Sequence, residues 1–161
     1  MPNPLHIRPM NNDDLPSLSQ IYVRALDGTD ERWNQESAHA LLTDWLRRQP
    51  ELAFTAEYEN EIAGAFVVGV RPWWDGNHLV DGELFVEPEF QQHGIARHLL
   101  KRVLDQAIEK YSPVLWESYT FRNDTFPLTW YKRLGFREIE EWVMIRADIT
   151  TVANQLSSLP G

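Results

Sequence analysis

The sequence contains no cysteine. Without thiols, the protein cannot be a disulfide-stapled scaffold, bind zinc through thiolates or use a cysteine nucleophile. Its 161 residues are long enough for a domain to bury a core of its own, so such staples are not needed. We therefore expect a single domain over residues 1–161, with its core over about 6–148.

Positive charge is also scarce. There are 15 Lys and Arg residues against 24 Asp and Glu residues, which leaves a formal net charge of −9 at pH 7. Proteins that bind nucleic acid need clustered cations to displace counterions, so we expect no nucleic-acid partner. An acidic surface instead favours solubility and the attraction of cationic molecules.

Long apolar segments are missing as well. The longest, 62–70, contains Gly64 and Gly69 and is too short to span a bilayer. The chain begins Met-Pro-Asn-Pro and has no basic-then-apolar signal pattern. These features predict a cytoplasmic protein with no membrane association.

Hydrophobic periodicity divides the chain into alternating elements. Apolar residues at helical spacing predict helices over 13–25, 38–46, 95–108 and 125–134. Alternating or continuous apolar runs predict strands over 6–10, 52–58, 62–70, 78–86, 114–119 and 136–145, the last as a closing strand or hairpin. We expect a loop over 71–77 and a loosely held tail over 150–161. This order predicts a mixed α/β or α+β fold whose sheet is antiparallel in the middle.

The stretch 84–97 is the most informative for chemistry. It predicts a strand, a tight loop and the start of the long helix, where unpaired N–H groups and about half a positive charge suit a phosphate. Gly94 allows a ligand to approach the backbone, and Pro88 must end the strand pairing. The stretch is neither a dinucleotide-binding glycine motif nor a Walker A loop. By itself it is also compatible with an ordinary strand–loop–helix joint.

Two motifs in this region resemble those of the GNAT N-acetyltransferase superfamily. The run Gln91-Gln92-His93-Gly94-Ile95-Ala96 is similar to the family motif Q/R-x-x-G-x-G/A, and the preceding L-x-V-x-P pattern is matched by Leu84, Val86 and Pro88. A second family feature, an Asn before a short helix ending Y-x-x-x-G-F, is matched by Asn123 and 131–136. The sequence departs from the family pattern at Ala96, where Gly is commoner, and in the Asn-to-Tyr spacing, with Pro127 inside the helix start.

The resemblance implies a fold and a cofactor. The fold would be a mostly antiparallel, twisted sheet that splays between two strands and is flanked by about four helices. The donor would be acetyl-CoA, with no metal. The residues that the resemblance places against acetyl-CoA are Leu84, Phe85, Val86, Gln91, Gln92, His93, Gly94, Ile95, Ala96, Arg97 and Asn123.

The implied reaction is direct attack of an amine on the thioester in a ternary complex. Tyr131 matches the family tyrosine that acts as general acid toward the departing thiolate. Glu117 is our first choice for the base, while Asp81, Glu83 and ordered water stay open. A non-catalytic acyl-CoA-binding or regulatory module with the same fold is the alternative function.

The acceptor site is the least defined part of this interpretation. Acidic groups beside aromatic rings suit a cationic amine, on a small molecule or on a protein, through charge and cation–π attraction. The residues expected there are Trp33, Trp73, Trp74 and Asp75, with Asp27, Asp30 and Glu31 nearby. The tryptophans are equally compatible with an aromatic-rich core, and a homodimer stays open.

Overall fold

The computed structural model describes residues 4–122 and 126–158. The chain divides into two compact units, Met1–Tyr119 and Thr120–Gly161. Each unit is described by itself below. No helix in the described part of the chain is both long and apolar enough to cross a membrane.

The first unit is built on a five-stranded sheet in the order β1-β2-β3-β4-β5. Its strands are β1 (Leu5–Pro9), β2 (Ala53–Tyr58), β3 (Glu61–Trp73), β4 (Gly76–Val86) and β5 (Leu115–Glu117). The first four pair antiparallel with their neighbours, and β5 joins β4 in parallel. This confirms the expected mixed class and the mostly antiparallel sheet.

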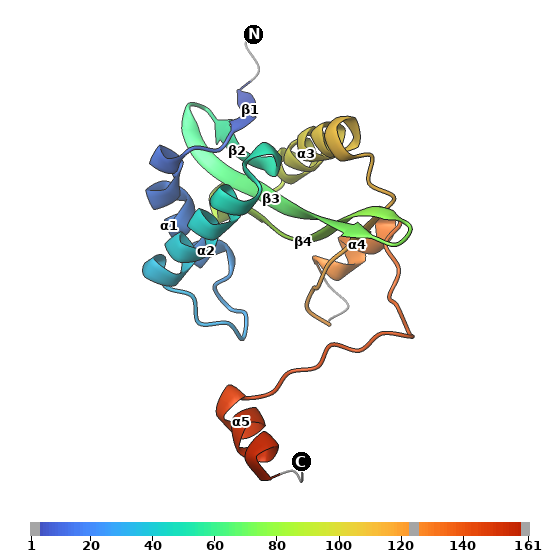
Figure 1. Ribbon diagram of the computed structural model, residues 1–161. Helices are drawn as coiled ribbons and strands as arrows, with labels where there is room; N and C mark the ends of the chain where they lie inside the picture. The colour runs from blue at the N-terminus through green and yellow to red at the C-terminus, as the bar shows by residue number, and fades with distance from the viewer. Residues whose placement is uncertain (1–3, 123–125, 159–161) are drawn as a thin grey trace. The chain divides into compact units, whose positions relative to one another are not determined.

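Three helices cover the two faces of this sheet: α1 (Leu15–Ala25), α2 (Gln35–Arg48) and α3 (Ile95–Tyr111). Val67 and Phe85 share one buried cluster with residues of α1 and α2. Phe54, whose side chain alternates to the opposite face, lies under the guanidinium of Arg102 on α3, 4.5 Å from its ring centroid. Figure 1 shows α1 and α2 together on one side of the sheet and α3 on the other.

The helices begin where the sequence supplies a cap. Asn34 accepts a hydrogen bond from the backbone N–H of Ser37, and the Ser37 hydroxyl accepts one from the N–H of Asn34 in return. Pro50 follows α2 and begins a short 3₁₀ turn over Pro50–Leu52. The helix α3 begins after Gly94, as its sequence predicts.

The expected loop over 71–77 is wrong, because most of it is strand. β3 runs to Trp73 and β4 begins at Gly76, and these two residues pair across a tight hairpin turn. Pro72 is accommodated because β2 pairs with β3 only as far as Val67. Beyond that point β3 has a strand neighbour on one side only, so the missing proline N–H interrupts no second ladder.

The sheet opens between β4 and β5. β5 pairs with β4 only over 78–80, whereas β3 stays paired with β4 as far as Val86. The opening follows a bulge at Asp81 and Gly82, whose φ angles are 56° and 118°. A Cβ at Gly82 would lie 2.8 Å from the Val67 carbonyl oxygen, so glycine is needed there. Within the described residues, the outer edge of β4 over 83–86 has no strand partner, as the expected splay requires.

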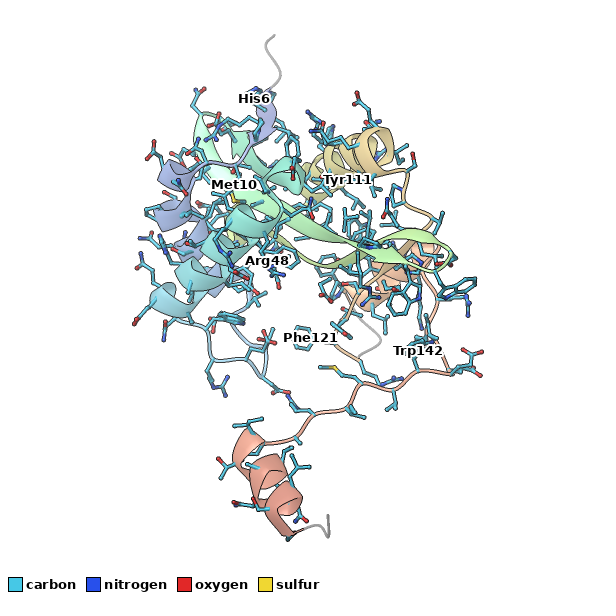
Figure 2. The ribbon with its side chains drawn as sticks, viewed as in Figure 1. His6, Met10, Arg48, Tyr111, Phe121 and Trp142 are labelled. Atoms are coloured by element: carbon cyan, nitrogen blue, oxygen red, sulfur yellow. The ribbon has the colours of Figure 1, made fainter. Side chains whose placement is uncertain are left out.

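The second unit contains α4 (Leu128–Arg133) and α5 (Ile149–Ser158). The predicted closing strand over 136–145 is wrong, since 136–148 lies in neither a helix nor a strand. Alternation of side chains makes a strand only where a neighbour supplies ladder bonds, and no strand pairs with this segment in the part of the chain described. From Ile139 to Ile145 its large apolar side chains are exposed, with Trp142 marked in Figure 2.

The tail is more regular than expected. Asp148 caps α5: its carboxylate accepts a hydrogen bond from the N–H of Thr151 at 3.1 Å, and its carbonyl accepts one from Val152. A capping Asp followed by apolar residues at helical spacing is a helix signal, and the polar composition of the tail concealed it. Every described residue of α5 is exposed.

Candidate functional site

The site begins where β4 leaves the sheet. The N–H of Glu87 donates to the Ala63 carbonyl at 2.8 Å, the last bond between this end of β4 and β3. A 3₁₀ turn follows over Pro88–Phe90, closed by the N–H of Phe90 donating to the Glu87 carbonyl. Strand pairing therefore ends at Pro88, as its missing N–H predicts.

The turn before α3 is shaped to leave the helix start open. Gln92 and Gly94 both take left-handed conformations, with φ of 69° and 77°. No side chain among the described residues caps α3, and a Cβ placed on Gly94 would meet only the His98 ring, at 3.6 Å. The N–H groups of the first helical turn thus face a space that an anion can enter, which is the arrangement that suits a phosphate.

The side chains of this loop have two kinds of role. His93 Nδ1 lies 3.1 Å from the Phe90 carbonyl and 3.0 Å from that of Gln91, and Gln91 donates to the Val86 carbonyl at 3.3 Å. These contacts hold the shape of the loop. Arg97 is exposed, and no acidic side chain among the described residues pairs with it, so its charge is available to an anion.

Most of the residues that the resemblance assigns to the cofactor lie together. Residues 84–86 form the end of β4, and 91–97 form the turn and the first helical residues immediately after it. The side chains of Phe85, Val86 and Ile95 are buried, so ligand contacts there would come from backbone. Asn123 lies outside the described residues.

An acid–tyrosine pair lies beside this end of β4, on the face that α1 covers. The Tyr22 hydroxyl donates to Glu83 Oε2 at 2.9 Å, and burial raises the pKa of Glu83 to about 7. The Tyr22 ring is edge-on to Trp33 and to Phe85, with 5.0 Å between centroids in both pairs. Glu83 was one of several open choices in the sequence. Tyr22 was missed, because its helical spacing is that of an ordinary core residue.

A cavity of about 220 Å³ lies next to Trp33. It is lined by Val23, Arg24, Leu26, Asp27, Gly28, Glu31, Arg32 and Trp33. Trp33 Nε1 donates to Glu31 Oε2 at 2.6 Å, so the acidic and aromatic groups expected there do meet. Two carboxylates and two guanidinium groups line it, so a cationic group would be received on the side of Asp27, Glu31 and the Trp33 ring.

The other residues predicted for the acceptor lie elsewhere. Trp73, Trp74 and Asp75 form the β3–β4 turn, at the start of β4, whereas Trp33 packs on Tyr22 beside the end of that strand. At about 3.3 Å per residue, eight residues of strand separate these ends by roughly 25 Å. The structure therefore does not bring these three residues into one pocket with Trp33.

Glu117 belongs to a separate polar cluster at that turn. Its Oε2 accepts a hydrogen bond from Arg71 at 2.9 Å and lies 2.9 Å from His78 Nδ1. His78 is buried, and its Nε2 lies 2.8 Å from Asp75 Oδ1. Carboxylates only accept, so both ring nitrogens of His78 act as donors. The carboxylate of Glu117 thus serves as a partner for two cationic groups.

Tyr131 lies in the second unit, on α4. Its ring is 5.4 Å from that of Trp130 and 5.1 Å from that of Phe136, between centroids. The N–H of Phe136 donates to the Tyr131 carbonyl, and Gly135 takes φ of 100°. The Y-x-x-x-G-F pattern is thus a helix followed by a left-handed glycine, as helix ends favour. The role of Tyr131 as the general acid stays a prediction.

No group of three or more metal-binding side chains occurs among residues 4–122 and 126–158.

The sequence comparisons agree with the geometry of the loop. The family profile of the GNAT acetyltransferases matches residues 15–136. An uncharacterized N-acetyltransferase of Methanocaldococcus jannaschii is 26% identical over 139 residues, which cover 83% of this chain. The match spans 61% of that relative's length.

Solved structures share the fold. A CoA complex of an aminoglycoside N-acetyltransferase superposes with a TM-score of 0.68 at 22% identity, over 89% of this chain and 94% of that one. A predicted acetyltransferase from Clostridium acetobutylicum, determined with acetyl-CoA, gives 0.69 at 19% identity, over 88% and 96%. With the splayed β4, the open turn at Gly94 and the matched profile, the chain belongs to the GNAT family of N-acetyltransferases.

Proposed function

We propose that this protein transfers an acetyl group from acetyl-CoA to a primary amine by direct attack. The observation that carries the proposal is the open turn at Gly94, which directly follows the unpaired end of β4. An extended ligand arm can add to such a strand edge, while a diphosphate occupies the helix start. One ligand that carries both parts is a coenzyme A thioester.

The backbone would do most of the binding. N–H groups of residues 92–96 would hold the diphosphate, with Arg97 adding charge. The main chain of Phe85 and Val86 would pair with the pantetheine arm, and an N–H near Val86 would polarise the thioester carbonyl. Bound acetyl-CoA supplies an activated acetyl group. The sequence contains no cysteine to carry that group, which agrees with direct attack by the amine.

We propose Glu83, in place of Glu117, as the base that takes the proton from the amine. Glu83 lies beside Phe85 on β4, and the hydrogen bond from Tyr22 orients its carboxylate. Its pKa of about 7 suits proton transfer near neutral pH. Tyr131 would give its phenolic proton to the departing thiolate, as the family resemblance implies.

The acceptor would enter through the cavity next to Trp33. Asp27 and Glu31 supply negative charge there, and Trp33 supplies a ring face. These groups favour a cationic amine on their side of the cavity, while Arg24 and Arg32 line the remainder. The fold shared with an aminoglycoside N-acetyltransferase supports testing aminoglycosides first, followed by polyamines and peptide amines.

Titration calorimetry with acetyl-CoA, followed by thiol release with these amines, tests the proposal. We expect saturable binding and turnover with at least one polycationic amine. Binding without turnover on any amine would favour the alternative, a non-catalytic acyl-CoA-binding module. Failure to bind acetyl-CoA would reject both functions.

A further inference from the structure

An ion pair joins Arg24 on α1 to Glu87. Glu87 precedes the segment 88–94 between β4 and α3, which we call the cofactor loop. Both carboxylate oxygens of Glu87 are engaged by Arg24: Nε lies 2.9 Å from Oε1 and 3.2 Å from Oε2, and Nη2 lies 2.5 Å from Oε2. Glu87 is only 8% exposed, whereas the side chain of Arg24 is half exposed. The pair is therefore anchored on its acidic side and open to solvent on its basic side.

Each partner stands at a boundary. Glu87 makes the last bond of this end of β4 to β3 and also closes the 3₁₀ turn that leads to Gly94. Arg24 lies in the last turn of α1 and lines the 220 Å³ cavity next to Trp33. Arg24 thus bonds the residue just before the cofactor loop and also lines the proposed acceptor cavity.

The charges around this loop explain why the pair matters. Glu87 and Glu89 place two carboxylates just before the turn that would receive a diphosphate. Arg24 neutralises Glu87 through two hydrogen-bonding nitrogens, Nε and Nη2. The negative charge of Glu89 also contributes to the raised pKa of Arg24. Without Arg24, Glu87 would be a buried and unpaired carboxylate, which is costly and repels an approaching anion.

We infer that Arg24 is a positioning residue that acts through Glu87 on the diphosphate-binding loop. It holds the start of the loop in place and cancels the charge that opposes the diphosphate. The inference rests on the proposed function for the identity of the ligand. It adds a dependence of acetyl-CoA affinity on a side chain of α1 that does not itself belong to the cofactor motif.

The test compares two donors in Arg24→Met. Acetyl-CoA carries the diphosphate, and S-acetyl-pantetheine lacks it. Losing a charge-assisted bond should lower kcat/KM with acetyl-CoA and weaken its binding by about tenfold in Arg24→Met. Arg24 also lines the acceptor cavity, so its loss can affect the reaction with both donors alike. The criterion is therefore the difference between them: the loss of kcat/KM with acetyl-CoA should exceed that with S-acetyl-pantetheine by about tenfold, because the second donor makes no use of the loop. Arg24→Lys keeps the charge without the two-nitrogen contact and should recover part of the loss.

Arg32→Met is the matched control. Arg32 lines the same cavity, but its guanidinium bonds the Thr29 carbonyl and not the loop. This variant should leave acetyl-CoA binding unchanged in calorimetry and should alter only the KM for the amine.

Three outcomes would overturn the inference. They are equal losses with both donors in Arg24→Met, unchanged acetyl-CoA binding in that variant, and an effect of Arg32→Met as large as that of Arg24→Met. If Arg24→Met fails to fold, Arg24→Lys decides the question with the same two donors, since the inference requires a larger loss with acetyl-CoA than with S-acetyl-pantetheine. A wild-type protein that binds no acetyl-CoA would instead refute the proposed function, and the inference with it.

Discussion

At the scale of single residues, the two most informative groups lie within one stretch of chain. Glu83 and Gly94 are both near the end of β4, but they act by different physics. The proton affinity of Glu83 depends on its surroundings, since burial raises its pKa. Gly94 acts through what it lacks, because the absence of a Cβ leaves the helix start accessible.

The pKa of Glu83 predicts the pH dependence of the reaction. A base works only in its deprotonated form, so kcat/KM for the amine should rise as the pH increases through about 7. Glu83→Gln should lower kcat by about 10²-fold or more and remove this limb of the profile. Glu117→Gln is the matched comparison and should keep the limb. A profile that survives in Glu83→Gln but disappears in Glu117→Gln would return the base to Glu117.

Gly94→Asp tests the diphosphate site directly. The carboxylate would stand beside the first helical N–H groups and repel the diphosphate, and the left-handed conformation at φ of 77° adds a small folding cost. We expect calorimetric affinity for acetyl-CoA to fall by at least about 100-fold. Gly94→Ala separates the two effects, since it carries the backbone cost without the charge. Similar losses in both variants would indicate backbone strain and not charge.

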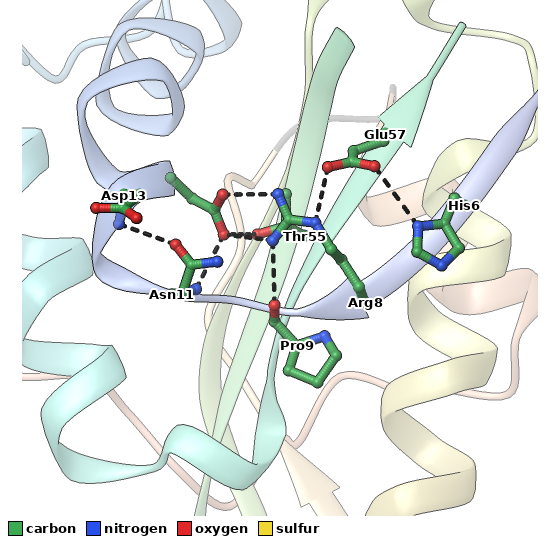
Figure 3. Close-up of polar contacts among 8 residues, drawn as sticks. His6, Arg8, Pro9, Asn11, Asp13, Thr55 and Glu57 are labelled. Atoms are coloured by element: carbon green, nitrogen blue, oxygen red, sulfur yellow. Dashed lines mark hydrogen bonds and ion pairs between the residues drawn. The ribbon is translucent and has the colours of Figure 1, made fainter. Parts of the chain in front are cut away.

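At the scale of elements, clusters of charge join segments that are distant in sequence. In the first of these, Arg8 on β1 pairs with Asp14 at the start of α1, with 2.8 Å from Nη1 to Oδ2 and 2.7 Å from Nη2 to Oδ1. Its Nε donates to Glu57 on β2 at 2.7 Å, and His6 approaches the other oxygen of that carboxylate. Figure 3 shows Arg8 beside the Glu57 carboxylate, with His6 at the other oxygen of that carboxylate.

Loss of Arg8 should therefore be costly to stability. Burial of the Asp14 side chain would raise its pKa, but hydrogen bonds from Arg8, from the Asn11 N–H and from Thr55, together with the charge of Arg8, keep that pKa below its usual value. Arg8→Met leaves Asp14 buried without its cation and should reduce the free energy of unfolding by about 3 kcal/mol. Urea denaturation measures this loss. Arg47→Met breaks only an exposed helix pair with Asp44 and should change stability by less than about 0.5 kcal/mol.

The cluster at the β3–β4 turn predicts a dependence of stability on pH. Hydrogen bonds raise the pKa of His78 above its ordinary value. The bond to Glu117 has the largest effect, and the bond to Asp75 adds to it. Arg71 also faces the cluster through its bond to Glu117. A raised pKa means that the folded state favours the charged ring, so this stabilisation is complete below about pH 6.5 and is lost as the pH rises through the folded-state pKa.

Thermal unfolding between pH 6 and pH 9 checks this expectation. The midpoint of the wild-type protein should fall over that range more steeply than the midpoint of His78→Gln, which lacks the titrating group. Parallel curves for the two proteins would show that His78 is not charged in the folded state.

At the scale of the whole molecule, local signals were reliable where they stood close together in the chain. A glycine, a proline and apolar residues at helical spacing were sufficient to predict the turn at Gly94 and the helix after it. The β3–β4 hairpin differs from the sequence prediction, because Pro72 indicates a loop unless the strand on its far side is known to have ended. The segment 136–145 differs for the complementary reason, since alternation predicts a strand but no described strand pairs with it.

The contacts that define the chemistry are long-range. Tyr22 reaches Glu83, and Arg24 reaches Glu87, across more than half of the first unit in sequence. No periodicity signals such a pairing, because each residue looks ordinary in its own element. Likewise, the sequence predicts one acceptor site from Trp33, Trp73, Trp74 and Asp75. In the structure, the length of β4 separates the hairpin turn that carries the last three from Trp33.

The order of the elements, the family motifs and the glycine turn follow from the chain alone, because capping, periodicity and backbone freedom are local properties. Whether a carboxylate is suited to act as a base, or pairs with cations, depends on burial and on neighbours brought by other elements. Glu83 and Glu117 are alike as residues, and only the packing of α1 against β4, and of β5 against the hairpin turn, makes them chemically different.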